Sequence, residues 1–390
     1  MVFLHISDLH FGNVGYTIER AKSNIEDILD VLATANFDKP HAIFITGDLI
    51  YAKDGSSRQQ SNLQMLEKFI DNIMQILEVK KDNIFIVPGN HDVKRGEKRL
   101  AKCEEIKNKY ELEDGISNDA YKYLQKGFTD FQKLHLGICS REYNLRPHLD
   151  FRSTYNVLSL NTALVSCQDQ EERSLIIDIY SVRKELEKSD GEKPIIAIGH
   201  HPIESMHERE SKMLLSLFFD YNVQIYLCGH EHQMICSTYC NNSNGSSKLY
   251  QFRCGTLMSR HPDKSDTDML VYVGTIDNKY IGHVLPIKWD RRFERWMPDT
   301  GISYYREKSL DGFIYINKNR DDINQEKLAS FIDTFLPELK AYGATIISEK
   351  LDSLIQSKGN QDHIECEYIK AYLIRRGYIA EIKSGVYQIN

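Results

Sequence analysis

The chain has 390 residues and a formal net charge of −7, and hydrophobic residues make up 41% of it. That length is enough for two or three domains with a large core, and the composition is that of a globular protein. The net negative charge argues against a protein that binds nucleic acid non-specifically over its whole surface, but it is compatible with a local basic groove. The sequence contains no run of about 18 apolar residues, so we expect no membrane span.

The N-terminal part of the chain predicts strands that alternate with amphipathic helices. The expected elements are strand 2–7, helix 17–35, strand 41–46, helix 59–79 and strand 83–87. Such an alternation implies a parallel sheet with helical crossovers. Because the chain enters a strand at once, we expect no cleavable signal peptide. The eight cysteines form no C-x-x-C pair, which favours reduced thiols and a cytoplasmic protein.

Residues 93–150 depart from this alternation of strands and helices, because they are charged, rich in tyrosine and mostly helical by pattern. We interpret them as an insertion, after which the sheet resumes near Tyr155. The following elements are expected to be strand 155–161, helix 170–188, strand 194–198, helix 208–220 and strand 223–227. From about 233 to 288 the pattern is β-rich, and these strands could add a second sheet.

The C-terminal part of the chain predicts a connector at 289–320 and a small α+β domain at 321–390. The pattern of that domain predicts helices at 323–339 and 344–357 and a hairpin around Lys383, which is the outline of a winged-helix fold. Its eleven acidic and eight basic residues are a poor balance for reading DNA. We therefore favour a docking or oligomerisation domain that binds a protein partner.

Five short motifs place polar residues at the ends of the predicted strands. They are DLH at 8–10, GD at 47–48, GNHD at 89–92, GHHP at 199–202 and GHEH at 229–232. Strand ends form the site in open α/β sheets, and residues two apart on a strand face the same way. The candidate metal ligands are Asp8, His10, Asp48, Asn90, His200, His230 and His232. We interpret His5, His41 and His283 as hydrogen-bonded core residues instead.

These candidates supply imidazole, carboxylate and one amide oxygen, with no thiolate. Such a mixture suits manganese, with iron or zinc as alternatives. Seven ligands are too many for one ion, but they fit two ions about 3.5–4 Å apart that share a carboxylate. A hydroxide that bridges two such cations is a ready nucleophile, and phosphate esters are its natural target because their oxygens can span both metals.

The order and spacing of the five motifs resemble the signature of calcineurin-like metallophosphoesterases. The resemblance covers about residues 1–288, which we take as the catalytic domain. IGHHP and CGHEH look most like the phosphodiesterase side of the family, which includes cyclic-nucleotide phosphodiesterases and DNA-repair nucleases. The resemblance implies an α/β fold of two sheets flanked by helices in four layers, here with the helical insertion and the small C-terminal domain added.

The resemblance also implies a division of roles within the site. One metal would take Asp8, His10, Asp48 and His232, and the other would take Asp48, Asn90, His200 and His230, with Asp48 bridging. His91 would contact the phosphate and protonate the leaving oxygen, a role open to imidazole near neutral pH. Asp92 would orient His91. His201 matches no ligand position, and we expect it behind the ligands or at the rim.

A basic stretch directly after the GNHD motif bears on the substrate. VKRGEKRLAK occupies 93–102, and within it Lys94 and Arg95 lie too close to His91 to be far from the site. A cationic rim there would attract anionic substrates, whereas the more distal basic residues are expected on a solvated helix face. We therefore expect a metal-dependent hydrolase of phosphodiester bonds in nucleic acid or nucleotides. The alternatives are a phosphomonoesterase or phosphoprotein phosphatase, and a non-catalytic scaffold.

Overall fold

The chain folds into two compact units, Met1–Asp299 and Thr300–Asn390, in the computed structural model. The described residues are 1–12, 17–35, 37–50, 60–110, 115–167, 173–233, 235–241, 248–258, 269–277, 282–299, 314–316, 335–357, 373, 378–383 and 386–389. The predicted connector and the start of the predicted helix 323–339 fall mostly outside them. Within these ranges no helix is long and apolar enough to cross a bilayer.

The first sheet combines the N-terminal strands with strands from the end of the first unit. Its order is β12 (Arg295–Pro298), β11 (Gly282–Asp290), β10 (Leu270–Ile276), β1 (Val2–Ile6), β2 (Ala42–Thr46) and β3 (Ile84–Val87). Strands β1, β2 and β3 are parallel, whereas β10 to β12 run antiparallel to their neighbours. Every residue of the three parallel strands is buried, which is why they read as continuous apolar runs.

The second sheet contains the other strands of the first unit. Its order is β4 (His148–Phe151), β5 (Asn156–Ser159), β6 (Ile195–Ile198), β7 (Val223–Cys228), β9 (Lys248–Arg253) and β8 (Ile235–Cys240). Strands β5, β6, β7 and β9 are parallel, and β4 and β8 are antiparallel edges. The expectation that β5 to β7 extend the first sheet was therefore wrong, because they form the second one.

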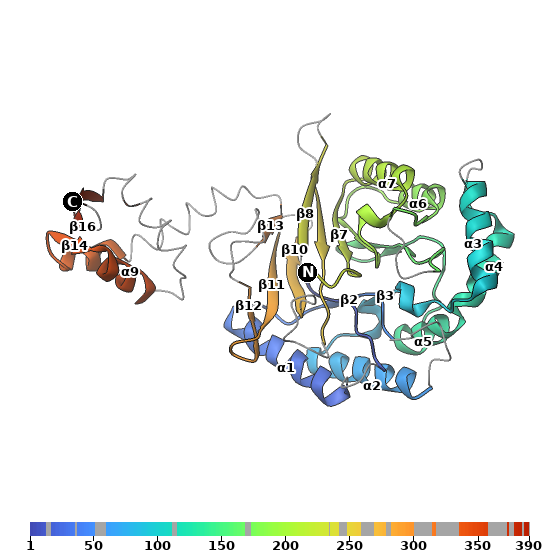
Figure 1. The fold of residues 1–390 in the computed structure, drawn as a ribbon, viewed down its shortest axis with the longest axis horizontal. Helices are drawn as coiled ribbons and strands as arrows, with labels where there is room; N and C mark the ends of the chain where they lie inside the picture. Colours follow the sequence, from blue (N-terminus) through green and yellow to red (C-terminus); the bar gives the residue numbers. More distant parts are fainter. Residues whose placement is uncertain are drawn as a thin grey trace. The chain divides into compact units, whose positions relative to one another are not determined.

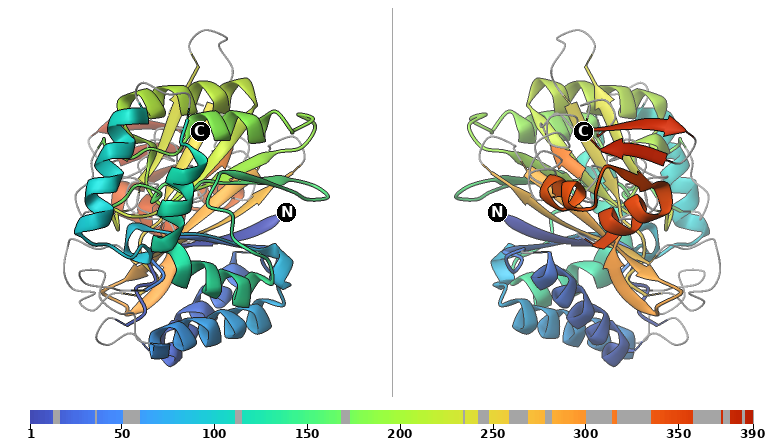
Figure 2. Two further views of the ribbon diagram at one scale, coloured as in Figure 1. Left: turned by 90° about the vertical axis from the view of Figure 1, so that its right-hand side faces the viewer. Right: turned by 90° about the vertical axis from the view of Figure 1, so that its left-hand side faces the viewer.

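The helices complete a four-layer sandwich, which confirms the predicted fold class. Its main helices are α1 (Ile18–Thr34), α2 (Gln60–Leu77), α6 (Ile179–Leu186) and α7 (Glu208–Asp220). Helices α1 and α2 pack together on one face of the first sheet, and α6 and α7 cover the second sheet (Figure 1). Figure 2 shows α1 and α2 in blue on the opposite side of the unit from α6 and α7 in green. Between them, the two sheets face each other through β2 and β7 and through β3 and β5.

Helix α6 begins later than the pattern at 170–188 suggested. Its N-cap is Asp178, which has a positive φ of 57° and whose side chain accepts a hydrogen bond from Ser181 N. Just before it, Leu175 forms a β-bridge with Met206, and residues 173–178 are not helical. The acidic cap and the bridge override the apolar spacing that favoured a longer helix.

The insertion at 93–150 is mostly helical, as expected, but its last residues form the edge strand β4. Its helices are α3 (Glu97–Tyr110), α4 (Asn118–Gln125) and α5 (Thr129–Cys139). Four short 3₁₀ helices also occur in the described chain, namely η2 (Lys81–Asn83), η3 (Asn90–Asp92), η4 (Lys126–Phe128) and η5 (Ile203–Ser205). Helix α5 contacts α2 and β3, so the insertion is packed against the first sheet.

Arg99 links the insertion to the segment that follows β5, although the pattern placed it on a solvated helix face. Its guanidinium is buried and donates to Leu124 O at 3.1 Å, Leu164 O at 2.7 Å and Ser166 O at 3.4 Å. Burial of a charge is costly unless hydrogen bonds compensate it, and three carbonyl oxygens provide that compensation here. The charge pattern of 93–102 therefore mixes one structural cation with exposed ones.

A buried histidine of α5 should make the stability of the protein depend on pH. His135 Nδ1 donates to Arg141 O at 2.9 Å, and burial lowers the pKa of His135 from 6.5 to about 4. A lowered folded pKa contributes stability that is present above pH 6.5 and is lost as the pH falls toward 4. We expect the wild type to lose roughly 2 kcal/mol more than His135→Asn between pH 7 and pH 4.5. Urea unfolding at both pH values measures this difference.

Asparagine is chosen for this test because its amide nitrogen can keep the hydrogen bond that His135 Nδ1 makes. The control is His148→Asn, because the side chain of His148 is 49% exposed. Equal pH dependence of unfolding in the wild type and in His135→Asn would contradict the assignment.

The C-terminal unit has a core of its own. Strands β14 (Thr345–Ile347), β16 (Val386–Ile389) and β15 (Ile379–Lys383) form an antiparallel sheet in that order, and α9 (Ser348–Ser357) follows β14. Residues 335–341 are helical, and β13 (Ile314–Ile316) precedes them. The predicted helix at 344–357 is thus a strand followed by a shorter helix. The β-branched run TII explains the strand.

Candidate metal centre

The predicted ligands converge at the carboxyl ends of strands from both sheets. Asp8 and His10 follow β1, Asp48 follows β2 and Asn90 follows β3. His200 follows β6, and the GHEH motif follows β7. Because β2 contacts β7 and β3 contacts β5, the two sets of strand ends meet. The sequence motifs thus come from two sheets rather than from one edge of a single sheet.

One group of candidate ligands consists of Asp8, His10 and His232. His232 Nε2 lies 3.1 Å from Asp8 Oδ1 and 3.1 Å from His10 Nε2. These three side chains offer ligand atoms that all lie within 4.8 Å of one another. Two imidazole nitrogens and one carboxylate oxygen that converge in this way form a donor set for a divalent transition-metal ion.

A second group forms around the amide of Asn90. Asn90 Oδ1 lies 3.1 Å from His200 Nε2 and 3.1 Å from His230 Nδ1. Asp48 stands between the two groups, because its Oδ2 lies 3.4 Å from His200 Nε2 and 4.0 Å from His10 Nε2. A carboxylate in that place can contact an ion on either side, so the arrangement fits a dimetal site with a shared ligand.

Several of these candidate ligands have a left-handed backbone conformation. Positive φ angles occur at Asp8 (52°), His10 (46°), Asp48 (51°), His230 (78°) and His232 (52°). Such conformations are uncommon for residues other than glycine, and each costs on the order of 1–3 kcal/mol unless the surroundings hold it. They turn the chain sharply after each strand, and this brings consecutive polar side chains to the same side.

Glycines next to the ligands allow the loops to approach closely. Gly47 has a φ of 90°, and a Cβ there would lie 2.7 Å from His200 Nδ1. A Cβ on Gly229 would overlap both Ser7 Oγ and Asp8 Oδ2. The glycines of the motifs are therefore needed for the packing of the two sheets at the site.

Thr46, which the sequence reasoning missed, sets the tautomer of His200. His200 Nδ1 lies 2.7 Å from Thr46 O, and because a carbonyl oxygen only accepts, Nδ1 carries a hydrogen. Nε2 therefore faces Asn90 and Asp48 as the ligand atom. Burial opposes protonation of His200, but Asp48 outweighs burial and raises the pKa of His200 to about 9. A bound cation would compete with the proton on Nε2.

The charge states of Asp48, Asp8, His10 and His230 suit divalent ions, whereas at His232 burial opposes protonation but Asp8 outweighs burial and raises the pKa. Burial opposes ionisation of Asp48, but the neighbouring imidazoles, His200 first, outweigh it and hold its pKa well below the usual value. Burial likewise opposes ionisation of Asp8, but His232 outweighs it and lowers the pKa to about 2. Burial lowers the pKa of His10 and of His230 to about 4. At neutral pH these groups are charged carboxylates and neutral imidazoles, the forms that bind metal.

The remaining predicted residues surround this centre. His91 lies with its Nε2 3.9 Å from Asp48 Oδ2, and its backbone N–H donates to Asp48 Oδ1 at 2.8 Å. The carboxylate of Asp92 accepts hydrogen bonds from the backbone N–H groups of Gly89 at 2.9 Å and Leu49 at 3.1 Å. Asp92 thus fixes the loops after β2 and β3 to each other, and its orientation of His91 stays a prediction.

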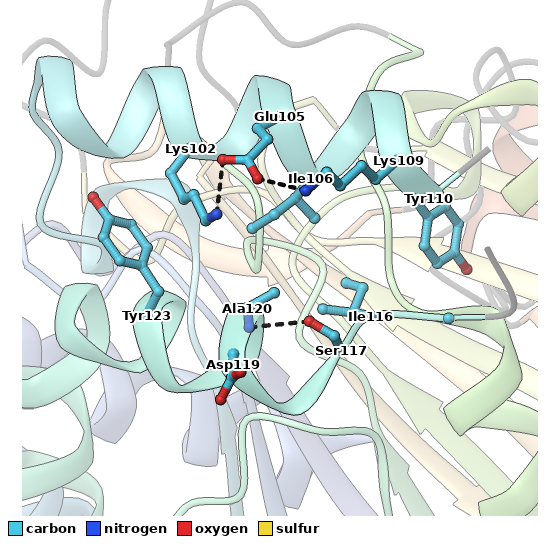
Figure 3. A pocket seen from close by; sticks show the side chains of 11 residues that line it. Lys102, Glu105, Ile106, Lys109, Tyr110, Ile116, Ser117, Asp119, Ala120 and Tyr123 are labelled. Carbon is cyan, nitrogen blue, oxygen red and sulfur yellow. Dashed lines mark hydrogen bonds and ion pairs between the residues drawn. The ribbon is translucent and has the colours of Figure 1, made fainter. Parts of the chain in front are cut away.

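Two of the cavities that the insertion lines in the described chain contain basic residues of helix α3 or of the segment before it. The first, of about 410 Å³, lies between α3 and α4, and its Lys102 and Lys109 are both paired with Glu105 at 2.7 and 2.8 Å (Figure 3). The second, of about 620 Å³, is the cationic pocket. It is lined by Lys94, Arg95, Gly96, Glu97, Lys98, Arg99, Tyr123, Lys126 and Gly127. Only the second contains a predicted rim residue.

Arg95 connects the cationic pocket to the metal centre. Its guanidinium donates to Asn90 O from Nη2 at 3.0 Å and from Nε at 3.3 Å. Lys94 N donates to Gly127 O at 2.8 Å, which holds the start of the insertion against η4. The structure therefore places two of the predicted rim residues, Lys94 and Arg95, in the lining of this pocket. It also adds Lys126, which no motif indicated because it lies more than thirty residues further along the chain.

Comparisons with known proteins agree with this site. Residues 1–234 match the family model of the calcineurin-like phosphoesterases. The chain is 26% identical over 363 residues to an uncharacterized metallophosphoesterase-like protein, YydB, of Bacillus subtilis (strain 168), and the match covers 87% of this chain and 72% of that protein.

A comparison with solved structures gave matches of low identity. A purple acid phosphatase, PPD1, from yellow lupin seeds has a TM-score of 0.45 at 11% identity, with 76% of this chain and 53% of that chain covered. This chain thus spans about half the length of that phosphatase. A Vps29 mutant from Entamoeba histolytica has a TM-score of 0.34 at 10% identity, with coverages of 77% and 97%.

The family match spans more than half of the chain and includes all five motifs. The residues that it covers carry the two groups of carboxylate and imidazole ligands described above. This chain belongs to the calcineurin-like phosphoesterase family.

Proposed function

We propose that the protein is a dinuclear metal-dependent phosphodiesterase that acts on nucleic acid or nucleotides. One ion would be held by Asp8, His10, Asp48 and His232, and the other by Asp48, Asn90, His200 and His230. The pairwise distances within the two groups and the place of Asp48 between them support this assignment. Manganese suits this donor set, with iron or zinc as alternatives.

The chain's own residues supply the acid–base chemistry around the ions. Bound at these residues, two cations would supply Lewis-acid chemistry toward the phosphate and the attacking water. His91 is the proposed general acid, because its ring lies beside Asp48, is partly exposed and is not one of the proposed metal ligands. Protonation of the leaving oxygen by a positioned imidazole is a common catalytic role. Asp92 would hold the loop that carries His91.

The cationic pocket is the observation that carries the choice of substrate. Five of its lining residues are basic and one, Glu97, is acidic. In the cavity between α3 and α4, by contrast, Glu105 neutralises the lysines. Cationic side chains that line a pocket beside a phosphoesterase centre would bind the phosphates that flank the scissile one. A diester within a nucleotide chain offers such phosphates, whereas a simple monoester does not.

A substrate panel tests the proposed function directly. The purified protein is assayed with Mn²⁺ on single-stranded DNA, RNA, cyclic nucleotides, bis(p-nitrophenyl) phosphate and p-nitrophenyl phosphate. We expect turnover of at least one diester and a preference for diesters over the monoester. Turnover of the monoester alone would replace this proposal with a phosphomonoesterase, and the absence of any turnover would reject it.

Charge reversal of the pocket should weaken the binding of long substrates. We expect Lys94→Glu combined with Lys98→Glu to raise KM for single-stranded DNA about tenfold and to reduce the slope of log K against log salt by about 1–2. The effect on bis(p-nitrophenyl) phosphate should be much smaller, because that substrate has no flanking phosphates. Steady-state kinetics over a range of about 50 to 200 mM salt measure both quantities.

The matched control reverses the same number of charges elsewhere in the insertion. Lys122 on α4 and Lys133 on α5 are exposed and lie outside the lining of the cationic pocket. Lys122→Glu combined with Lys133→Glu should leave the salt slope as in the wild type. If both double variants lowered the slope equally, the effect would come from overall charge, and the pocket would not be a phosphate-binding site.

A further inference from the structure

Thr162 makes an unusual set of hydrogen bonds directly behind the metal centre. Its hydroxyl oxygen accepts from His200 N at 3.1 Å and from His201 N at 3.0 Å. The same oxygen lies 2.9 Å from the ring nitrogen Nδ1 of His201. All three residues are buried, so these contacts are not exchanged with water.

The number of hydrogen bonds that this hydroxyl group can accept and donate determines which nitrogen of His201 carries a hydrogen. A hydroxyl group has two acceptor lone pairs and one hydrogen to donate. Two backbone N–H groups already use both lone pairs, so the contact to His201 must be made by the hydroxyl hydrogen. Nδ1 is therefore the acceptor, and the hydrogen of the neutral ring sits on Nε2. His201 has the opposite tautomer to His200, whose Nδ1 donates to Thr46 O.

The ring of His201 lies beside the rings of two proposed metal ligands. Its ring centroid lies 4.7 Å from that of His200 and 4.4 Å from that of His230, and a ring nitrogen of each of the three lies within 4.8 Å of the others. Tyr226 Oη donates to His201 O at 2.6 Å, so the backbone is fixed as well. Among the described residues, Nε2 of His201 has no hydrogen-bond partner.

We infer that His201 is a substrate-contacting residue that donates its Nε2–H to a non-bridging oxygen of the bound phosphate. The inference rests on the proposed function, because it concerns the substrate of that site. Proximity to His200 and His230 alone would suggest a third imidazole ligand for one ion. The protonated Nε2 argues against that reading, because a metal ligand needs a free lone pair on the coordinating nitrogen. A fixed, preorganised donor stabilises the charge that develops on phosphate oxygens.

Two substitutions of His201 distinguish the role of Nδ1 from the role of Nε2. In His201→Asn the amide can still meet Thr162, but no donor reaches the position of Nε2. In His201→Gln the longer side chain returns an N–H group to that position. We expect His201→Asn to bind inorganic phosphate about tenfold to a hundredfold more weakly when Mn²⁺-loaded, as for loss of a charge-assisted hydrogen bond. His201→Gln should recover part of that loss, and both variants should keep the wild-type manganese content.

Two measurements test the inference without relying on turnover. Calorimetry follows phosphate binding to the Mn²⁺-loaded protein, and ¹⁵N NMR of labelled histidine in the EDTA-treated protein reports which nitrogen of His201 bears hydrogen. Loss of manganese from His201→Asn, unchanged phosphate affinity, or a hydrogen on Nδ1 would each overturn the inference. If the wild type cleaves no diester while His201→Asn still weakens phosphate binding, the proposed function fails and the role of His201 stands.

Discussion

Replacing Asp48 with asparagine should remove the metal ions and reduce the activity to that of EDTA-treated wild type. Asp48 is buried, and its Oδ2 faces ligand nitrogens of both groups. Two dications about 3.5–4 Å apart would repel each other, and a carboxylate shared by both would supply the charge that keeps them in place. Asparagine has nearly the same shape but no charge. The metal content measured by mass spectrometry should fall from about two ions per chain to background.

The fold should survive this substitution, since the asparagine oxygen can still accept from His91 N as Asp48 Oδ1 does at 2.8 Å. Thermal unfolding in EDTA checks that point. A matched control is Asp178→Asn, because Asp178 is also buried but accepts from Tyr121 Oη at 2.9 Å and from Ser181 Oγ at 2.7 Å, outside the centre. It should lower stability while metal content is kept. Two bound ions in Asp48→Asn would show that Asp48 is not the bridge.

The second large effect is expected for His91→Ala. This variant should keep both metal ions but lose about 10²–10⁴-fold in kcat, the usual contribution of a general acid. His91 contacts Asp48 through its backbone N–H, which alanine retains, whereas its ring is more exposed than those of His10 and His200. The loss should be largest for alkyl leaving groups and smaller for p-nitrophenolate, because a stable anion needs little protonation on departure.

Kinetics with a series of diesters of graded leaving-group basicity, together with metal analysis, measure this prediction. His148→Ala serves as the control, because the ring of His148 is half exposed and lies beside Asp150 and Glu185 on the second sheet's edge. It should leave kcat unchanged. An emptied metal site in His91→Ala would make His91 a ligand, and an equal loss for every leaving group would assign it to phosphate binding instead of proton transfer.

Much of the local structure follows from the sequence because it depends on neighbouring residues. Apolar runs such as IIAI predicted β6 within one residue, and helical spacing together with its acidic start predicted α7 at Glu208–Asp220. The predicted helix at 170–188 began too early, because the bridge between Leu175 and Met206 depends on a partner about thirty residues away. Apolar spacing alone carries no information about such a partner.

The candidate site was predictable for a different reason. Ligand residues must follow strands and must be preceded by small residues, so their spacing is visible in the chain as GD, GNHD and GHEH. The residues that form hydrogen bonds to the histidines of the site have no recognisable sequence motif. Thr46 and Thr162 are ordinary polar residues at strand ends, and only their distances to His200 and His201 show that they set two opposite tautomers.

The sequence by itself determined which residues end strands, which chemical groups they present and hence the family. Only the tertiary structure decided that β5 to β7 form a second sheet with β8 and β9, that β10 to β12 complete the first, and that Arg99 is buried. Strand pairing depends on contacts between residues far apart in the chain. An apolar run in the sequence does not show which strand it pairs with, or whether the two strands are parallel or antiparallel. The meeting of two sheets, and with it the metal centre and the cationic pocket, is therefore a property of the folded chain.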